Sequence, residues 1–315
     1  MEHKQMGRVQ IKTASKIIQG KVDNWISSID DELLQAKLKV GVMVSGGCIT
    51  SLLIGEKVND FDIYFNSKQL TIDVCNYYVK KFNDTNYTED SDKVTIPQVK
   101  VDDDGLVSIY IKSKGYASEN NEDTASLQYE YFEQMEEQAA KDYIEKDIGH
   151  ALDKERRSTG AKYRPVYLST NAITLSDKVQ LITRFYGSPE DVHKNFDFVH
   201  AMCYWTREKG CVVSIEAMDC MNSKTLKYNG SLFPLCSQFR IAKFVARGWK
   251  INAGNQFKIQ KQISELDLNS IKVLRDQLSG VDTAYFNEVL TKLEEAGVDK
   301  VDNTYLMTLI DKMFG

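Results

Sequence analysis

The chain has 315 residues, of which 42% are hydrophobic and 27% are charged, and its formal net charge is −5. This length is sufficient for one large domain or two ordinary ones, with a substantial core. The chain contains no run of about 18 apolar residues, so we expect no membrane span and no membrane partner. A slightly acidic protein is also a poor general DNA-binding protein.

The six cysteines and the N-terminal residues indicate the cellular compartment. The cysteines are scattered, and they form no C-x-x-C pair and have no histidine at zinc-ligand spacing. The first residues, MEHKQMGRVQIKTASK, include no apolar stretch of the kind found in secretory signals. We therefore expect reduced thiols and a cytoplasmic protein.

Charge is unevenly distributed along the chain. Residues 222–262 contain eight basic side chains and no acidic one, whereas residues 119–155 contain twelve acidic side chains and three lysines. The overall charge therefore conceals one basic block in an acidic molecule. Such a block can hold phosphate groups locally.

The first part of the chain predicts helices followed by a strand–helix–strand unit. Apolar residues recur at helical spacing over residues 8–38, which predicts one long helix or two short ones that break near Gly20. A short apolar strand is expected at Val40–Ser45, followed by a Gly-Gly turn and a helix that ends at Gly55. A second strand is expected at Phe61–Phe65.

A helix at Thr71–Asn83 precedes what we interpret as an insertion over residues 85–165. Two strands, Lys93–Val101 and Leu106–Lys112, are joined by DDDG, which predicts a hairpin turn rather than a calcium loop. A long acidic helix is then expected at Thr124–Lys154.

Strands resume after the insertion and give way to helices near residue 216. The expected strands are Val166–Leu168, Ala172–Leu175, Val179–Phe185 and Phe196–Trp205, with a short helix at Pro189–Lys194. The expected C-terminal helices are Pro234–Trp249, Leu268–Leu278, Thr283–Ala296 and Asn303–Met313. The predicted fold is therefore α+β: a mixed β-sheet with flanking helices over residues 1–215, and an α-helical domain over residues 216–315.

The segment Val42–Phe65 combines two features that suit a nucleotide. At Ser45, Gly46 and Gly47 the missing side chains would let a ligand approach the backbone, and the next helix points its N-terminal amides at the same place. Asp60 and Asp62 leave the same face of the second strand, and two neighbouring carboxylates favour a bound cation such as Mg²⁺. Either feature alone is common in buried turns; together they indicate a triphosphate site.

This segment resembles the signature of the DNA polymerase beta-like nucleotidyltransferase superfamily. The run SGGCITSLLIG, then EKVN, then DFDIYF matches most closely the first motif of tRNA CCA-adding enzymes and bacterial poly(A) polymerases. The chain has Thr50-Ser51 where that subfamily usually has Arg-Asp, so the resemblance alone does not imply CCA addition. The overall pattern is also similar to that of phage proteins that carry the same signature.

The resemblance implies a nucleotidyltransferase-type sheet and a two-metal reaction. Two Mg²⁺ ions would act on an NTP, a nucleoside monophosphate would pass to a hydroxyl acceptor, and pyrophosphate would leave. The superfamily also has a third carboxylate on a neighbouring strand. The best candidate is Asp197, an acid in an otherwise apolar segment, whereas Asp177 and Asp191 lie in turn-like contexts. His193 and His200 flank Asp197 and are expected to be structural.

Three basic residues of the segment Pro234–Trp249 share one helix face. Arg240, Lys243 and Arg247 are spaced at i, i+3 and i+7, as expected for a stripe that contacts the triphosphate or an RNA acceptor, although a solvated helix face has the same pattern.

Three classes of function remain open from the sequence. The first is nucleotidyl transfer to an RNA end, a protein or a small molecule. The second is a cyclic-dinucleotide or oligonucleotide synthase of the same fold, and the third is a non-catalytic nucleotide-binding protein. If the chain is phage-encoded, it would act in the host cytoplasm.

Overall fold

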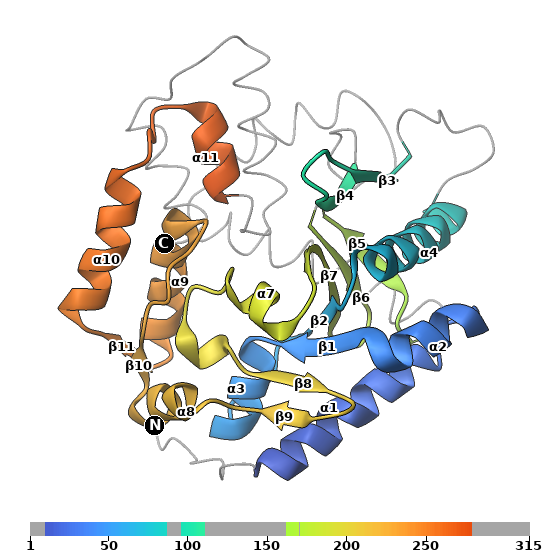
Figure 1. The fold of residues 1–315 in the computed structure, drawn as a ribbon, viewed down its shortest axis with the longest axis horizontal. Coiled ribbons are helices and arrows are strands. Elements are labelled where there is room, and N and C mark those ends of the chain that lie inside the picture. The colour runs from blue at the N-terminus through green and yellow to red at the C-terminus, as the bar shows by residue number, and fades with distance from the viewer. Residues whose placement is uncertain (1–9, 87–95, 111–161, 170, 279–315) are drawn as a thin grey trace, which may run out of the picture. The chain divides into compact units, whose positions relative to one another are not determined.

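The computed structural model describes residues 10–86, 96–110, 162–169 and 171–278 (Figure 1). The chain divides into two compact units. Unit 1 comprises residues 1–112, 161–231 and 244–258, and unit 2 comprises residues 113–160, 232–243 and 259–315. The units therefore interleave along the chain, whereas the predicted domains are consecutive; the predicted division at residue 215 stays a prediction. In the part of the chain that the structure describes, no helix has the length and apolar character needed to cross a membrane.

Two helices open unit 1, α1 (Ile11–Ile26) and α2 (Glu32–Gly41). The expected break near Gly20 is wrong, because Gly20 lies inside α1. The helix ends instead at Ile26, and α2 begins after Asp31, whose carboxylate accepts a hydrogen bond of 2.9 Å from the amide of Leu34. This side-chain cap satisfies an amide that the first turn of a helix leaves without a backbone partner, and it fixes the start of α2.

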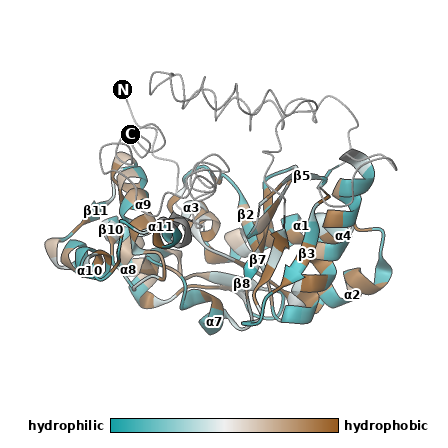
Figure 2. Cartoon of the chain, turned by 90° about the horizontal axis from the view of Figure 1, so that it is seen from above, coloured by the Kyte–Doolittle hydropathy of each residue, from teal (hydrophilic) through white to brown (hydrophobic). Residues whose placement is uncertain are grey.

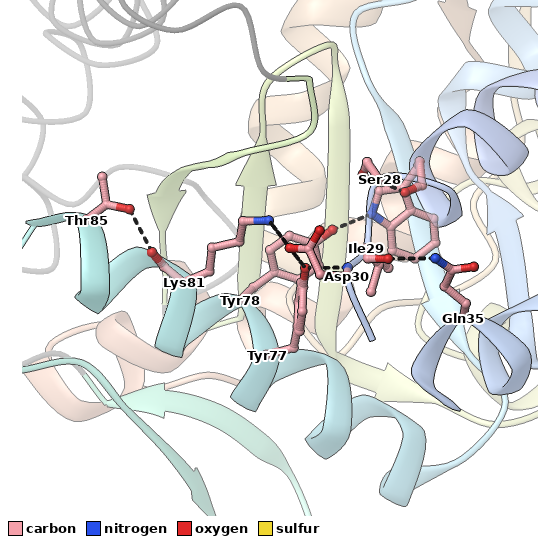
Figure 3. Close-up of polar contacts among 9 residues, drawn as sticks. Ser28, Ile29, Asp30, Gln35, Tyr77, Tyr78, Lys81 and Thr85 are labelled. Atoms are coloured by element: carbon pink, nitrogen blue, oxygen red, sulfur yellow. Dashed lines mark hydrogen bonds and ion pairs between the residues drawn. The ribbon is translucent and has the colours of Figure 1, made fainter. Parts of the chain in front are cut away.

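The turn between α1 and α2 is tied to α4 (Lys68–Asn86) by polar contacts (Figure 3). The indole Nε1 of Trp25 donates to the hydroxyl of Tyr78 over 2.8 Å, and both side chains are buried. The amide of Asp30 donates to the hydroxyl of Tyr77 over 3.1 Å, and Lys81 pairs with the Asp30 carboxylate at 3.2 Å. These contacts fasten α1 and the turn after it to α4.

The expected strand–helix–strand unit is confirmed. It consists of β1 (Val42–Ser45), α3 (Gly47–Ile54) and β2 (Phe61–Phe65). The helix ends where Gly55 adopts a left-handed conformation with φ 74°, which a glycine accommodates without strain. Strands β1 and β2 are antiparallel neighbours, and they pair Ser45 with Asp62.

These two strands lie inside a seven-stranded mixed sheet, which confirms the expected α+β class. Its order is β5-β6-β7-β2-β1-β8-β9, and the β2–β7 pair is parallel while the other pairs are antiparallel. The remaining strands are β5 (Pro165–Leu168), β6 (Ala172–Leu175), β7 (Val179–Tyr186), β8 (Tyr204–Thr206) and β9 (Gly210–Val212).

The two faces of the sheet are covered differently. Phe61, Ile63 and Phe65 of β2 point to one face, where α4 packs against β2, β5 and β7. The short helix α7 (Pro189–His193) lies across the other face, where its Val192 packs against Met43 and Tyr64. Figure 2 shows α7 and α4 on opposite sides of the strands. Asp62 shares the α7 face, because side chains alternate along a strand.

The expected hairpin in the insertion is confirmed as β3 (Gln98–Val101) and β4 (Val107–Tyr110), which pair antiparallel as a separate two-stranded sheet. Gly105, with φ 86°, forms part of their turn. The acidic helix expected at Thr124–Lys154 lies outside the described residues.

The strand expected over Phe196–Trp205 is wrong. Only Tyr204–Thr206 pairs with the sheet, and the preceding residues form a loop and the 3-10 turn η1 (Val199–Ala201). The apolar side chains of this segment are nevertheless buried: Phe198 is 1% and Cys203 0% exposed. Its apolar composition therefore reflects burial of a loop, not strand pairing.

The region after residue 215 is mainly helical, as expected. The helices are α8 (Ile215–Ser223), α9 (Pro234–Ala246), α10 (Ala253–Ser264) and α11 (Ile271–Leu278). One short parallel pair, β10 (Thr225–Leu226) with β11 (Lys250–Ile251), interrupts them. In unit 2 the side chain of Gln277 joins α11 to the start of α9, because its Nε2 donates to the Leu232 carbonyl over 3.0 Å. The helices expected at Thr283–Ala296 and Asn303–Met313 lie outside the described residues.

Candidate functional site

The turn between β1 and α3 brings the backbone against a carboxylate. Gly46 has φ 95° and ψ −157°, a conformation that L side chains rarely adopt. A Cβ atom at Gly46 would lie 3.1 Å from Oδ2 of Asp62 and 4.0 Å from Cε2 of Phe196. Because any larger residue would enter this space, glycine is required here both by its backbone angles and by the neighbouring carboxylate.

The next residue, Gly47, has space at its Cβ position. A Cβ atom there would meet no heavy atom of the described residues within 4 Å. Gly47 begins α3, so the unpaired amides of the first helical turn start beside the Asp62 carboxylate. The turn therefore combines an accessible backbone, a helix N-terminus and an adjacent carboxylate.

Asp60 and Asp62 both lie close to α3. Asp62 is half-buried within β2, and Asp60 is exposed immediately before that strand. The thiol of Cys48 in the first turn of α3 has its pKa raised well above the usual value, first by burial and then by the negative charges of Asp62 and Asp60. Both negative charges thus act on a thiol in the first turn of α3.

The side chain of Ser45 faces inward and is fully buried. Its hydroxyl donates to the carbonyl of Cys203 over 2.7 Å, and its oxygen lies 2.9 Å from Nε2 of His193. A buried hydroxyl with two protein partners is not available to a ligand. Ser45 therefore contributes to the turn through its backbone and its anchoring contacts.

Asp197 lies in the loop between α7 and η1 and is 8% exposed. Its carbonyl accepts a hydrogen bond of 2.8 Å from the amide of Asn229, and its charge partly offsets the effect of burial on the pKa of His200. In the described ranges, no group of three or more histidine, cysteine, aspartate or glutamate residues is arranged to hold a metal ion. The roles of Asp60, Asp62 and Asp197 as metal ligands therefore stay predictions.

The strands that flank β2 supply no third acidic residue. On β7, the residue in register with Asp62 is Gln180, and neither β1 nor β7 contains an aspartate or glutamate. Gln180 was not anticipated from the sequence, because strand register cannot be read from a single strand. Phe196 was missed for a similar reason, since its place beside Gly46 depends on a loop that crosses the sheet.

The three basic residues of the predicted stripe fall in two units of the chain. Arg247 belongs to unit 1, where its Nε donates to Oε2 of Glu56 over 3.2 Å and its Nη2 contacts the same oxygen. Lys224 pairs with Oε1 of Glu56 at 3.0 Å. Burial favours a raised pKa for Glu56, but hydrogen bonds from Arg247 and Lys224 lower it. Arg240 and Lys243 belong to unit 2, and their phosphate contacts stay a prediction.

His200 lies in η1, after the loop that carries Asp197, and its ring belongs to an aromatic cluster. Its ring centroid is 4.3 Å from that of Trp249, 4.7 Å from that of Phe244 and 6.0 Å from that of Phe198. Neither ring nitrogen has a hydrogen-bond partner within the described protein atoms, and burial lowers the pKa to about 4. His200 is therefore neutral at pH 7 and acts as part of the core, as the sequence indicated.

Comparison with known proteins identifies one family. The model of the family described as "Gad2: Gabija anti-defense 2 family protein" matches residues 16–224 of this chain. This match includes β1, α3, β2 and the loop that carries Asp197. No curated protein matches the sequence significantly.

The solved structures to which the chain is similar include CCA-adding enzymes. The Thermotoga maritima CCA-adding enzyme complexed with tRNA has 12% sequence identity and a TM-score of 0.38, covering 88% of this chain and 54% of that one. The Bacillus stearothermophilus enzyme in complex with CTP has 12% identity and a TM-score of 0.37, with 87% and 51% covered. A CCA-adding enzyme in complex with ATP has 11% identity and a TM-score of 0.39, with 96% and 50% covered. This chain thus spans about half the length of these structures, and likeness at this level does not establish a shared activity.

Proposed function

Because the chain belongs to the Gabija anti-defense 2 family, we propose that it counteracts the Gabija defence as a Mg²⁺-dependent nucleotidyltransferase. The reaction transfers a nucleoside monophosphate from an NTP to a hydroxyl acceptor and releases pyrophosphate. The acceptor is an RNA end, a protein or a small molecule. The family description supplies the anti-defense role, and the geometry of the β1–α3 turn supplies the chemistry.

The contact between Gly46 and Asp62 is the observation that carries this proposal. A carboxylate 3.1 Å from the Cβ position of Gly46 places a negative group directly beside the backbone at the start of a helix. A nucleoside triphosphate with Mg²⁺ suits this combination, because its phosphates can accept from the amides while its cation binds the carboxylate. Gly47, with free space at its Cβ position, is the residue over which such a ligand can approach.

The residues at the turn fit Mg²⁺. Asp60 and Asp62 offer carboxylate oxygens, the ligand type that Mg²⁺ prefers, and the like charges of two neighbouring carboxylates favour a cation between them. We propose that these two residues hold two Mg²⁺ ions, with Asp197 as a further ligand when substrate is bound. When bound, the metal would neutralise phosphate charge and acidify the acceptor hydroxyl.

The chain's own groups bind and orient the nucleotide. Backbone amides of Gly46 and Gly47 donate to phosphate oxygens, and the α3 dipole adds a favourable field. The half-buried position of Asp62 holds its carboxylate in one place beside those amides. Arg247 is proposed to neutralise the triphosphate or the acceptor, which requires exchanging Glu56 for phosphate.

One observation favours a second candidate function. No described strand next to β2 carries an acidic residue, and the described residues contain no three-ligand metal cluster. A site with two carboxylates can bind a metal–nucleotide complex without turning it over. The alternative is therefore a non-catalytic protein that binds a nucleotide and acts on the defence by sequestering it or by contacting a partner.

The test is an assay of purified protein with Mg²⁺ and each of the four α-labelled NTPs, with RNA, protein and no added acceptor, following pyrophosphate release and label transfer. Asp62→Asn removes the charge and keeps the shape, so it should abolish turnover. Asp177→Asn is the matched control. Asp177 lies in the turn between β6 and β7, and it is not one of the predicted metal ligands. In parallel, cells that carry the Gabija defence are challenged with phage in the presence of each variant.

Turnover that requires Asp60 and Asp62, together with loss of anti-defense activity in the same variants, is the expected result. Mg²⁺-dependent NTP binding without turnover supports the non-catalytic alternative. Anti-defense activity that survives Asp60→Asn and Asp62→Asn together would overturn both.

A further inference from the structure

Ser45 is anchored by a histidine on the helix that crosses the sheet. Ser45 is the last residue of β1, and His193 is the last residue of α7, 148 positions further along the chain. The Ser45 oxygen lies 2.9 Å from Nε2 of His193, and the contact is buried. It is therefore a long-range bond that joins the glycine turn to α7.

The direction of this bond follows from the number of available protons. The Ser45 hydroxyl has one proton, and the Cys203 carbonyl at 2.7 Å can only accept. The proton between Ser45 and His193 must then come from Nε2 of the imidazole. Burial lowers the pKa of His193 to about 4, so a neutral ring with the proton on Nε2 fits this role at pH 7.

His193 also fixes Phe196 on the other side of the turn. The backbone amide of Phe196 donates to the His193 carbonyl over 3.0 Å, and the two rings pack with centroids 5.0 Å apart. Phe196 lies 4.0 Å from the Cβ position of Gly46. His193 thus holds two neighbours of Gly46: its side chain contacts Ser45, and its carbonyl accepts from Phe196.

The helix that carries His193 is itself firmly placed. The Ser188 hydroxyl and the Asp191 carboxylate form reciprocal caps at its N-terminus, and Pro189 sets its first turn. The amide of Gly187 donates to the carbonyl of Phe65, at the end of β2, over 2.9 Å. This hydrogen bond fixes the segment that leads to His193 against β2, the strand that carries Asp62.

Resting on the proposed function, we propose that His193 is a positioning residue of the nucleotide site: it donates to Ser45 and thereby sets the Gly46–Gly47 backbone against Asp62. His193 has no role as a base toward Ser45, because the serine is fully buried and its proton is committed to Cys203. Its effect on the reaction passes through the backbone of the turn.

The test compares three substitutions. His193→Gln keeps an N–H donor near the place of Nε2, His193→Phe keeps a ring and removes the donor, and Ser45→Ala removes the bond from its other end. The first readout is the pair of backbone amide signals of Gly46 and Gly47 in protein labelled with ¹⁵N-glycine. The second is kcat and KM for Mg²⁺–NTP, measured beside the thermal midpoint of unfolding.

In His193→Phe and Ser45→Ala we expect both glycine amides to shift in the same direction, and His193→Gln to move them back towards wild type. We expect kcat/KM to fall by about tenfold or more in the donor-less variants, because displacement of a binding group is costly even when it remains present. The double variant Ser45→Ala/His193→Phe should lose no more of kcat/KM than Ser45→Ala alone, because the two changes remove the same hydrogen bond.

Unchanged Gly46 and Gly47 amides in a folded His193→Phe protein would overturn the inference. So would additive losses in the double variant. If wild-type protein has no nucleotide activity but the glycine amides respond as described, the positioning role stands and the proposed function fails, so the two failures are distinguishable. If His193→Phe does not fold, Ser45→Ala and His193→Gln give the same comparison.

Discussion

Asp62 lies directly opposite Ser45 across β1 and β2, so the residue that ends the first strand and the carboxylate of the second share one face of the sheet. The next residue, Gly46, approaches the same carboxylate, because a Cβ atom there would lie only 3.1 Å from Oδ2 of Asp62. The arrangement explains why an ordinary-looking strand, turn and helix can present both amides and carboxylates to the same ligand.

The two glycines of the turn should respond differently to alanine. Gly46→Ala should lower the free energy of unfolding by about 1–3 kcal/mol, because it combines a positive φ with a Cβ 3.1 Å from Asp62. The added methyl group of Gly47→Ala meets no atom of the described residues within 4 Å, so this change should alter the free energy of unfolding by less than about 1 kcal/mol. Urea unfolding measures both. Equal losses at the two positions would show that the Gly46 conformation is not the constraint.

The bond between Trp25 and Tyr78 should contribute more to stability than the exposed contacts beside it. Tyr78→Phe leaves the buried Nε1 of Trp25 without a partner and should cost about 1–3 kcal/mol of unfolding free energy. Tyr77→Phe is the matched control. It removes a hydroxyl that contacts Asp30 and Lys81 at the surface, and should cost less than about 1 kcal/mol. Comparable losses would argue against this difference in burial.

Stability should fall as the pH decreases from about 6.5 to about 4. Burial lowers the pKa of His200 to about 4, below its usual value of 6.5, so in this window the unfolded chain binds a proton that the folded chain excludes. The loss from His200 is on the order of 3 kcal/mol, complete near pH 4. His193, with a pKa also lowered to about 4 by burial, acts in the same direction. Unfolding free energies at several pH values measure the slope.

His200→Phe tests the assignment of that slope. Because neither ring nitrogen of His200 has a partner among the described residues, replacing the ring by an apolar one should cost little at pH 7 and reduce the pH dependence. If the pH dependence of the unfolding free energy is unchanged in His200→Phe, other titratable groups, among them the carboxylates, cause it.

The ion pair of Glu56 with Arg247 should be coupled but modest. Both side chains are partly exposed, 23% and 42%, so a double-mutant cycle of Glu56→Gln and Arg247→Gln should give about 0.5–1 kcal/mol, reduced by salt. Mg²⁺–NTP titrations of the same variants separate the two roles of Arg247. A weaker nucleotide affinity in Arg247→Gln, without a matching change in Glu56→Gln, would indicate phosphate contact.

The sequence was most informative where pattern and local geometry act together. The β1–α3–β2 unit was predicted to within a few residues, because the apolar strand, the paired glycines, Gly55 and the Asp-x-Asp spacing are all local signals. The β3–β4 hairpin follows from the same kind of signal, an aspartate–glycine turn between alternating residues.

Long-range features were not accessible in the same way. The apolar run Phe196–Trp205 has the composition of a strand, but it is buried as a loop. No local pattern encodes the strand register that pairs Gln180 with Asp62. Nor does a local pattern encode the chain crossing that brings His193 to Ser45. For Arg247, helical spacing placed it in a stripe with Arg240 and Lys243, but its carboxylate partner, Glu56, lies 191 positions away.

The parallel pairing of β2 with β7 has a consequence for synthesis. During translation the β1–β2 pair emerges with both of its outer edges unpaired, because its neighbours β7 and β8 begin at Val179 and Tyr204. More than one hundred residues must leave the ribosome before either edge is covered, and unpaired edges of this kind promote aggregation. Fragments that end before β7 should therefore be poorly soluble.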